Sequence, residues 1–491
     1  MTARSVLFSK GVSVQRSHPI LIGIKNRRRQ MGLLMLAADL LGFATAVGSV
    51  LVANGFVHLF LFQLSDLKYS VILFICLLLF MNSRLYPGVG INPAEEIKLV
   101  TQYTSTSFII GMILFSAIQI SWQPNVLAFF AVGSTSLLTI LLARWGTRIV
   151  ASQLGLWGEP VVVFGTAKQA TELSCYFCQR RRLGFVPLIA TNDTIRRKCA
   201  TCPIPVINLD DLLASHADRF LDQGIHTVLV DSSSAASISG MKASSELLRL
   251  FQHVTFVSDM DWLGGASISI HDYEGLMGIE AHKHKLNALD TLLKRGMDIL
   301  FGVLIGVLSL PIMLAAAILI RLDSAGAIFY KQERLGKKGR VIKIYKFRTM
   351  VTDGDCLLTE YLESHPEARL EWDQSQKLRQ DPRITRVGRF LRKFSIDELP
   401  QLYNVIKGDM SLVGPRPIMM DQMMLYGDRI EAYCGVRPGL TGFWQVSGRN
   451  HTTFEKRIHY DVYYVKNWSV WLDLYILLRT VWVALSRDGA Y

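Results

Sequence analysis

The sequence predicts a membrane protein of three parts: a four-helix transmembrane bundle, a middle α/β domain, and a C-terminal α+β domain with one more membrane-inserted helix. Its 491 residues exceed one ordinary domain and 50% of them are apolar, a combination that favours a membrane protein of several units. Long apolar runs precede residue 150, short β-type runs follow, and another apolar run lies near residue 300. We place the domains at residues 1–150, 151–285 and 286–491.

The first part holds four candidate spanning helices. Their apolar runs cover residues 31–53, 56–81, 103–120 and 126–142, and most approach the roughly 20 residues that a spanning helix needs. Cations precede the first run and follow the second and the fourth: Arg27, Arg28, Arg29, Arg84, Lys98, Arg144 and Arg148. Because positive loops stay in the cytoplasm, both ends of the bundle are expected there. Asp39 lies toward the end of a run, so plain hydrophobic anchors are favoured over an ion pathway.

The net charge and the cysteines indicate partners and compartment. The formal charge of +13 is concentrated after residue 280, and such a basic block usually faces the phosphates of nucleic acid, lipid or a nucleotide-linked substrate. The seven cysteines are an odd number, and the chain lacks a cleavable signal pattern. We therefore expect a reducing cytoplasmic setting and no disulfide framework.

Residues 159–264 alternate short β-type runs with helical segments. The β-type runs cover residues 160–165, 227–231 and 253–258, and the alternation predicts a Rossmann-like α/β domain. Its first turn, FGTAKQA at residues 164–170, lacks the glycine pattern that lets the backbone approach a pyrophosphate. A regulatory or packing role is therefore favoured over tight dinucleotide binding.

Two Cys-x-x-Cys pairs occur in this domain, Cys175 with Cys178 and Cys199 with Cys202. The spacing is typical of a four-thiolate zinc site. The first pair, however, continues a helix after the first strand and does not form a glycine-containing knuckle. The α/β pattern explains the sequence without a metal, and zinc is kept as the alternative.

A fifth apolar run, residues 297–320, is long enough to span the membrane but has cations on both sides. A straight crossing would place a strongly basic domain outside, against the positive-inside tendency. Pro311 removes a backbone donor and clashes with the preceding turn, so it suits the bend of a re-entrant helix over about residues 292–321. A kinked helix that crosses the membrane is the alternative.

The C-terminal part contains one adjacent pair of acids among cations, glycines and prolines. Asp397 and Glu398 lie in SIDELPQL, residues 395–402, directly after a basic run. Adjacent helical residues diverge by about 100°, so different tasks are expected: one carboxylate attacks a phosphorus atom and the other holds Mg²⁺ on the same diphosphate. The competing interpretation is an exposed acidic pair that balances Arg392 and Lys393.

Five motifs in order carry a resemblance to a known family. KFRTM (346–350), SIDELPQL (395–402), KGDMSLVGPRP (407–417), VRPGLTG (436–442) and WQVSGRN (444–450) make residues 294–491 similar to the bacterial sugar transferases, the monotopic phosphoglycosyl transferases. The bundle and α/β domain before them resemble the large members, in particular undecaprenyl-phosphate galactose phosphotransferases. The chain's SRDGAY end departs slightly from their RRDGAY.

The resemblance implies transfer of a hexose phosphate from a UDP-hexose to undecaprenyl phosphate, with release of UMP. The reaction would start a repeat unit of O antigen, capsule or exopolysaccharide, at the cytoplasmic face of the bacterial inner membrane. Galactose is the expected hexose and glucose the alternative. A multi-pass membrane homodimer is implied, and no nucleic acid is expected as a partner.

Residue roles follow by analogy with the matching motifs. Asp397 is the expected nucleophile of a ping-pong reaction, Glu398 is the Mg²⁺ ligand, and Pro311 marks the break of the re-entrant helix. Lys346 is assigned to catalysis as a phosphate-binding cation. The remaining candidates for phosphate or substrate binding are Arg348, Arg392, Asp409, Arg416 and Arg437.

Two other classes of protein stay open. The first 290 residues are also similar to membrane-bound nucleotide-sugar dehydratases, which need NAD and a Tyr-x-x-x-Lys base; Tyr403 and Lys407 have that spacing but lie far beyond the α/β segment. A non-enzymatic scaffold for polysaccharide assembly would leave the Arg, Gly and Pro motifs unexplained. Release of UMP distinguishes a transferase from a scaffold, and bound NAD would favour a dehydratase.

Overall fold

The computed structural model describes most of the chain, in two compact units, Met1–Asp259 and Met260–Tyr491. The described residues are 27–53, 64–83, 85–117, 126–190, 206–207, 225–231, 247, 249, 251, 253–257, 266–273, 276–283, 288–352, 354–375, 378, 380–447 and 453–486. The antiparallel hairpin of β6 (Ala266–Tyr273) and β7 (Leu276–Lys283) belongs to the second unit. The domain limits at residues 150 and 285 stay predictions.

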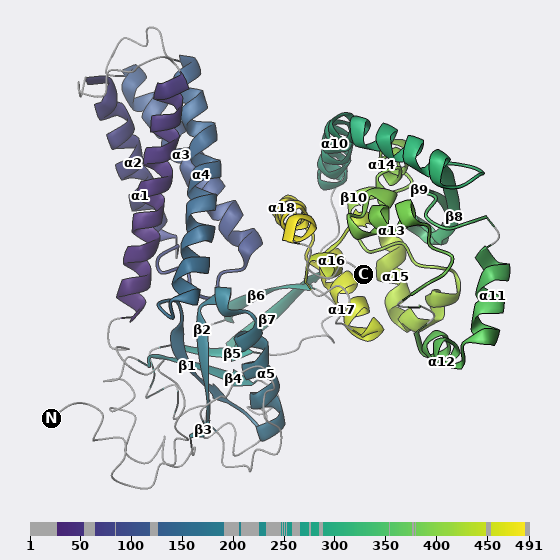
Figure 1. The fold of residues 1–491 in the computed structure, drawn as a ribbon. Coiled ribbons are helices and arrows are strands. Elements are labelled where there is room, and N and C mark those ends of the chain that lie inside the picture. Colours follow the sequence, from purple (N-terminus) through teal and green to yellow (C-terminus); the bar gives the residue numbers. More distant parts are fainter. Residues whose placement is uncertain are drawn as a thin grey trace. The chain divides into compact units, whose positions relative to one another are not determined.

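Four apolar helices open the first unit and lie side by side in Figure 1: α1 (Arg27–Ala53), α2 (Leu64–Asn82), α3 (Pro93–Ala117) and α4 (Val126–Gln153). The four helices expected from the apolar runs are confirmed. Helix α3, however, begins about ten residues before its apolar run, and α4 ends about ten residues after its run. Helices α1, α3 and α4 are long and apolar enough to cross a membrane, whereas the apolar part of α2 is the shorter Tyr69–Asn82.

A buried network of ion pairs joins three of these helices. Arg144 of α4 donates to the two carboxylate oxygens of Asp39 on α1, at 2.6 and 2.7 Å, and to Glu96 of α3 at 3.1 Å. Arg148 donates to Glu96 at 2.5 and 2.9 Å. The prediction that Arg144 and Arg148 lie in a loop is therefore wrong. Helix α4 continues through both residues, and carboxylates on α1 and α3 neutralise their charges.

A parallel sheet of five strands follows the four helices within the first unit. Its order is β3-β2-β1-β4-β5, and every pair is parallel. The strands are β1 (Glu159–Phe164), β2 (Phe185–Ala190), β3 (Val206–Ile207), β4 (Thr227–Asp231) and β5 (His253–Val257). The three predicted β-type runs are confirmed as β1, β4 and β5. Strand β1 is buried throughout, as a central parallel strand should be.

Helix α5 (Ala167–Gln179) follows β1, and the short turn η3 (Arg181–Leu183) leads to β2. Thr166 caps α5, because its hydroxyl accepts from the backbone N–H of Gln169. Cys175 and Cys178 lie on this helix, as predicted. Cys199 and Cys202 lie outside the described residues, so zinc stays an untested alternative.

The second unit combines small sheets with many short helices. The hairpin of β8 (Phe329–Leu335) and β9 (Val341–Phe347) is antiparallel, and β10 (Ser411–Val413) pairs in parallel with β11 (Gly439–Thr441). The helices and 3-10 turns are α10 (Ala288–Asp323), η5 (Lys337–Gly339), α11 (Gly354–Ser364), α12 (Pro366–Ser375), α13 (Arg386–Lys393), η6 (Ile396–Glu398), α14 (Gln401–Lys407), η7 (Asp421–Arg429), α15 (Ile430–Gly435), α16 (Phe443–Ser447), α17 (Phe454–Lys466) and α18 (Val470–Ser486).

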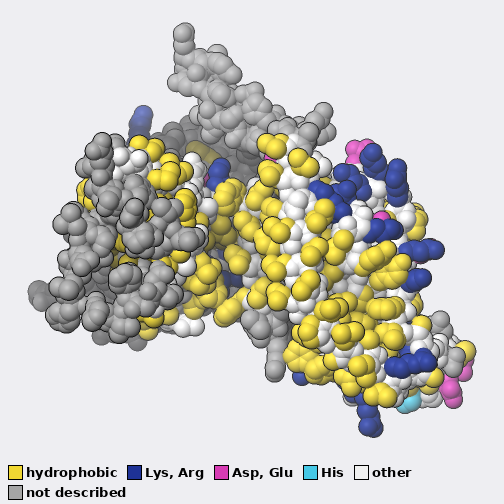
Figure 2. Space-filling model, turned by 90° about the horizontal axis from the view of Figure 1, so that it is seen from above, with side chains coloured by type: hydrophobic (Ala, Val, Ile, Leu, Met, Phe, Trp, Pro, Cys, Tyr) yellow, Lys and Arg dark blue, Asp and Glu magenta, His cyan; other side chains and the backbone are white. Residues whose placement is uncertain are grey.

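Helix α10 carries Pro311 and has a broad apolar surface. Its large exposed apolar side chains include Val303, Leu304, Val307, Leu308, Leu310, Ile312, Leu314 and Ile318. Figure 2 shows hydrophobic side chains gathered over this face of the unit, with Lys and Arg side chains along its margin. In Figure 1 the ribbon of α10 changes direction along its length.

Both ends of α10 are attached to the same unit. Near its start, Arg295 donates to the carbonyls of Val405 and Ile406 at the end of α14, each at 2.7 Å. Near its end, Ala316 and Ile320 pack in one cluster with Phe347 of β9 and Leu391 of α13. The apolar middle of the helix therefore lies between two anchored ends.

Candidate active site

The two adjacent acids lie on η6, a single turn between α13 and α14. Ser395 precedes this turn with a φ of 56°, in the left-handed region, and so redirects the chain out of α13. Asp397 is only 9% exposed, and the side chain of Glu398 is 19% exposed. The pair is therefore not the exposed surface pair of the competing interpretation.

Cations face both carboxylates. Lys346 of β9 donates to Oε1 of Glu398 at 2.8 Å, and Arg416 approaches the same oxygen at 3.4 Å. Burial, together with the adjacent charge of Glu398, raises the pKa of Asp397 to about 6 from an ordinary 3.8, although Lys346 and Arg392 oppose that rise. Asp397 is thus mostly ionised at pH 7, in surroundings poor in water, which suits a nucleophile.

KFRTM and the basic run before the acids pack directly on each other. A Cβ at Gly388 of α13 would lie 2.1 Å from the carbonyl oxygen of Thr349, so only glycine lets the two backbones approach this closely. The Nε of Arg392 then donates to the hydroxyl of Thr349 at 2.9 Å. Burial lowers the pKa of Arg392, and the nearby carboxylate of Asp397 opposes that change.

The motifs KGDMSLVGPRP and VRPGLTG likewise pack on each other, through the pairing of β10 with β11. A Cβ at Gly414 would lie 2.6 Å from the carbonyl oxygen of Arg437, and one at Gly442 would lie 2.3 Å from that of Gly414. These glycines let the strands meet without side chains between them. The loop that leaves β10 therefore has a fixed course, and it brings Arg416 to Glu398.

The structure thus brings together Asp397, Glu398, Lys346, Arg392 and Arg416. Three other predicted residues have local partners. Arg348 donates to the carbonyls of Ser324 and Ala325, just after α10, at 2.7 and 3.0 Å. Arg437 donates through Nε to the carbonyl of Gly408 at 2.8 Å, and Asp409 accepts from Lys407 at 2.8 Å. Substrate binding by these three stays a prediction.

Sequence reasoning missed one arginine beside Arg416, Arg457. Arg457 of α17 donates to the carbonyl of Arg416 at 3.3 Å. The guanidinium carbons of Arg457 and Arg416 lie 5.0 and 5.9 Å from the centre of the Trp444 ring. Burial lowers the pKa of Arg334 on β8, and the charges of Arg416 and Arg457 lower it further. Arg334 lies in the cation-rich segment before KFRTM and Arg457 beyond the last motif, so no spacing links them.

The carboxylates of the site can be compared with the ligands that Mg²⁺ requires. Within the described part of the chain, no group of three or more His, Cys, Asp or Glu side chains could hold a metal by itself. Asp397 and Glu398 supply two carboxylates, and Mg²⁺ commonly binds one or two carboxylates and completes its shell with phosphate oxygens and water. The residues fit a magnesium ion that is shared with a diphosphate substrate.

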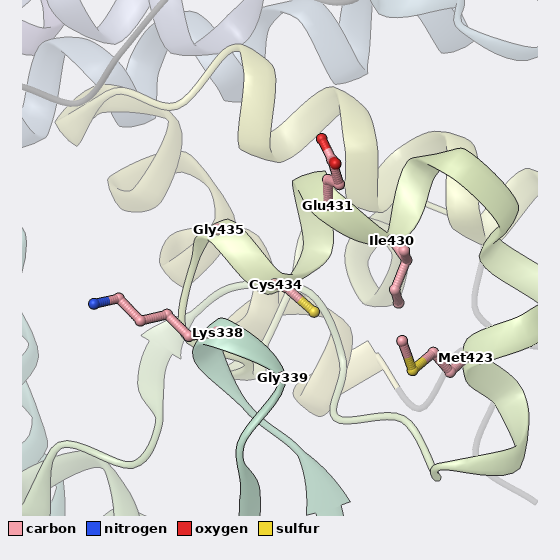
Figure 3. Close-up of a pocket in the computed structure, with 7 residues that line it drawn as sticks. All are labelled: Lys338, Gly339, Met423, Ile430, Glu431, Cys434 and Gly435. Atoms are coloured by element: carbon pink, nitrogen blue, oxygen red, sulfur yellow. The ribbon is translucent and has the colours of Figure 1, made fainter.

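A shallow hollow of about 410 Å³ lies elsewhere on the second unit, between the β8–β9 turn and α15. In Figure 3, Met423, Ile430 and the sulfur of Cys434 turn toward its centre, and the ammonium group of Lys338 points away. None of the predicted site residues lines it. It carries no chemistry that we can assign.

Comparison with known proteins identifies the family. A family model described as bacterial sugar transferase matches residues 289–487. The "Undecaprenyl-phosphate galactose phosphotransferase" of Salmonella typhimurium (strain LT2) is 35% identical over 75% of this chain and 77% of its own length. This chain belongs to the bacterial sugar transferase family. The likeness to the Salmonella protein extends well before residue 289, so the resemblance to the large sugar transferases is confirmed.

Two further relatives show how the likeness is distributed. The "UDP-glucose:undecaprenyl-phosphate glucose-1-phosphate transferase" of Escherichia coli (strain K12) is 36% identical over 45% of this chain and 46% of its own length. The "Exopolysaccharide production protein ExoY" of Sinorhizobium fredii is 46% identical over 40% of this chain and 88% of its own length. The Sinorhizobium protein therefore aligns over most of its own length with only two fifths of this chain.

Proposed function

We propose that this sugar transferase moves a hexose 1-phosphate from a UDP-hexose to undecaprenyl phosphate and releases UMP. The observation that carries the proposal is the buried carboxylate of Asp397 beside Glu398, with Lys346 and Arg416 from two separate motifs directed at Glu398. The names of the Salmonella and Escherichia relatives support the donor and acceptor classes. Galactose is the first choice, because the galactose relative aligns with more of this chain than the glucose relative.

The reaction proceeds in two half-reactions. An oxygen of Asp397 attacks the phosphorus that bears the hexose, the bond from that phosphorus to the bridging oxygen breaks, and UMP leaves with the electron pair. A phosphate oxygen of undecaprenyl phosphate then attacks the same phosphorus, and the Asp397 carboxylate leaves and is restored. Lys346, Arg392 and Arg416 bind phosphate charge in both steps.

Glu398, with Asp397 next to it, would hold Mg²⁺ at this site. The bound ion would neutralise charge on the diphosphate that otherwise repels the attacking carboxylate. Lys346 and Arg416, both directed at Oε1 of Glu398, orient that carboxylate. Their loss should weaken phosphate binding and metal affinity together.

Helix α10 enters and leaves the membrane from the cytoplasmic side in this proposal. Its two anchored ends support the re-entrant course, because a crossing helix would hold them on opposite sides of a hydrocarbon core of about 30 Å. A catalytic domain beside such a helix meets both a cytoplasmic nucleotide donor and an acceptor phosphate at the lipid interface. This arrangement suits a multi-pass protein of the bacterial inner membrane.

The remaining parts have supporting roles. The parallel order β3-β2-β1-β4-β5 is the strand order of a Rossmann-like domain, and its first turn favours regulation or packing over nucleotide binding. The protein acts as a homodimer in this proposal, which native mass spectrometry of the detergent-solubilised chain would test. The product would feed the synthesis of O antigen, capsule or exopolysaccharide; the Sinorhizobium relative is named for exopolysaccharide production.

The test is UMP release from a panel of UDP-hexoses by the full chain in detergent, with undecaprenyl phosphate and Mg²⁺. UDP-galactose should give UMP, and Asp397→Asn should lower the rate at least about a thousandfold, as removal of an attacking group does. Asp421→Asn, at an exposed acid of η7, is the matched control and should keep the rate. Full activity of Asp397→Asn, or no turnover of any UDP-hexose, would contradict the proposal.

A further inference from the structure

The chain segment that leaves α10 is attached to the strand that carries Lys346. Arg348 follows β9, and its backbone N–H donates to the carbonyl of Ile328 at 2.9 Å, so it continues the register of the β8–β9 hairpin. Its guanidinium group donates to the carbonyl of Ala325 at 3.0 Å, and to the carbonyl and hydroxyl oxygens of Ser324 at 2.7 and 2.8 Å. Three of the five N–H donors of this group are therefore engaged by the segment after α10.

A glycine makes this attachment possible. Gly326 has a φ of 124°, in the left-handed region, and a Cβ there would lie 2.1 Å from a terminal nitrogen of the Arg348 guanidinium group. Arg321, in the last turn of α10, donates to the carbonyl of Gly326 at 2.9 Å. The chain therefore turns directly against the guanidinium group, in a conformation and a space that favour glycine.

The elements that carry the catalytic side chains meet the same end of α10. Ala316 and Ile320 pack in one cluster with Phe347 of β9 and Leu391 of α13, and Ile396 of η6 packs against that cluster. Strand β9 carries Lys346, and η6 carries the two carboxylates. The predicted nucleophile and a cation that faces its neighbour therefore share one support, which is the part of α10 that leaves the membrane in the proposed re-entrant course.

Contacts within the site do not depend on Arg348. Lys346 donates to Glu398 at 2.8 Å, and Arg392 donates to Thr349 at 2.9 Å. Neither bond uses the guanidinium group that holds the segment after α10. Loss of the Arg348 contacts should therefore keep the carboxylates and their cations together while the catalytic part shifts against α10.

The two substrates of the proposed reaction respond differently to such a shift. A UDP-hexose diffuses in water, so it reaches the site whether or not the site has moved slightly relative to the membrane. The phosphate of undecaprenyl phosphate is held at the interface by its hydrocarbon chain. Because about 1 Å of misplacement can lower a rate about a hundredfold, a shift of the site relative to the interface impairs the step that uses the lipid.

We propose that Arg348 is a positioning residue: it fixes the end of α10 against β9, and thereby sets the position of the Asp397 carboxylate relative to the acceptor phosphate at the interface. This inference rests on the proposed function and replaces the predicted role of Arg348 in phosphate binding. Arg348 then governs transfer of the hexose phosphate from Asp397 to the lipid, and attack of Asp397 on the UDP-hexose does not depend on it.

The first test separates the two half-reactions, with the full chain in lipid nanodiscs made with or without undecaprenyl phosphate. Without the acceptor, UMP release in a single turnover of UDP-galactose measures formation of the phosphoryl-aspartate. With the acceptor, the steady rate of UMP release and the level of the intermediate measure transfer. Arg348→Gln should form the intermediate within about twofold of the parent rate and transfer it at least about tenfold more slowly. Arg429→Gln, at an exposed arginine, is the matched control and should equal the parent in both.

Three outcomes of this test overturn the inference. A slower first half-reaction of Arg348→Gln, or a higher UDP-galactose concentration at half-saturation, would show that Arg348 binds the donor phosphate. Equal losses in both half-reactions would show a general structural role, and parent rates in both would show no role. Arg348→Lys keeps the charge but lacks the planar fork, so it should recover transfer only in part; full recovery would contradict positioning through paired hydrogen bonds.

A second variant disturbs the same junction and leaves the arginine in place. Gly326→Ala puts a Cβ against the guanidinium group and should reproduce the selective loss of transfer, whereas Gly339→Ala, at another left-handed glycine but with no atom within 4 Å, should not. Because both changes act through one contact, Gly326→Ala combined with Arg348→Gln should transfer within about twofold of the slower single variant. Multiplied losses, or parent transfer by Gly326→Ala, would contradict the inference.

A readout without turnover measures the junction itself. Backbone amide exchange of residues 321–328, followed by hydrogen–deuterium exchange and mass spectrometry, should be at least about tenfold faster in Arg348→Gln, because hydrogen bonds from a charged donor are lost. Exchange of residues 288–297, at the other end of α10, should stay at the parent rate. Unchanged exchange at 321–328 overturns the inference. If no UDP-hexose is turned over, the proposed function fails, while amide exchange still decides whether Arg348 fixes the end of α10.

Discussion

The raised pKa of Asp397 predicts an acid limb in the pH dependence of the first half-reaction. With a pKa of about 6, the carboxyl group is about nine-tenths ionised at pH 7 and about one-tenth at pH 5. Only the ionised form attacks phosphorus, so the rate rises with pH through this window. Lowering the pH from 7 to 5 should therefore slow formation of the phosphoryl-aspartate about tenfold.

The assay is a single turnover of UDP-galactose without the lipid acceptor, with UMP and the covalent intermediate measured from pH 5 to 8. Asp461 needs a control, because burial raises its pKa to about 6 as well. Asp461→Asn should keep the acid limb of the parent if Asp397 is its source. A rate that stays flat down to pH 5 would refute the reasoning, because a carboxyl group with the ordinary value of 3.8 stays ionised there.

Three further predictions concern the framework. Arg144→Met leaves the buried carboxylate of Asp39 without its guanidinium partner and should cost about 3–5 kcal/mol. The change is measured as a lower unfolding temperature in detergent than for Arg28→Met, at an exposed arginine; equal temperatures would contradict it. Gly388→Ala forces a Cβ to 2.1 Å from Thr349 and should lower activity, whereas Gly296→Ala, with no atom within 4 Å, should not; equal activities would contradict this. Cysteines placed by Leu289→Cys and Leu322→Cys, at positions 65% and 78% exposed, should both react with a thiol reagent from the cytoplasmic side, and labelling from opposite sides would refute the re-entrant course.

The fold could be predicted where periodicity and composition decide it. Apolar runs located the four helices of the bundle, and β-type runs located three strands of the parallel sheet. The ends of α3 and α4 could not be placed, because those ends carry charges. Glu96 and Arg144 look like loop residues until each is seen with its partner on another helix, and hydropathy along one helix contains no information about such pairing.

The site could be predicted where a short motif contains the chemistry. Asp397 and Glu398 are adjacent in the chain, Lys346 and Arg416 lie in matching motifs, and Arg392 lies in the basic run directly before the acids. Arg457 could not be found, because it lies beyond the last motif and only the packing of α17 brings it to the backbone of Arg416. Charge alone did not reveal that Arg348 is directed at the carbonyls after α10.

The pair of Asp39 and Arg144 joins the first helix of the bundle to the last, across a separation of 105 residues. A ribosome that works from the N-terminus delivers Asp39 to the membrane well before Arg144 exists. During that interval the carboxylate on α1 has no guanidinium beside it, and a charge inside a membrane helix is costly. Synthesis therefore imposes an order of assembly, in which insertion of this protein is completed by its fourth helix and not by its first.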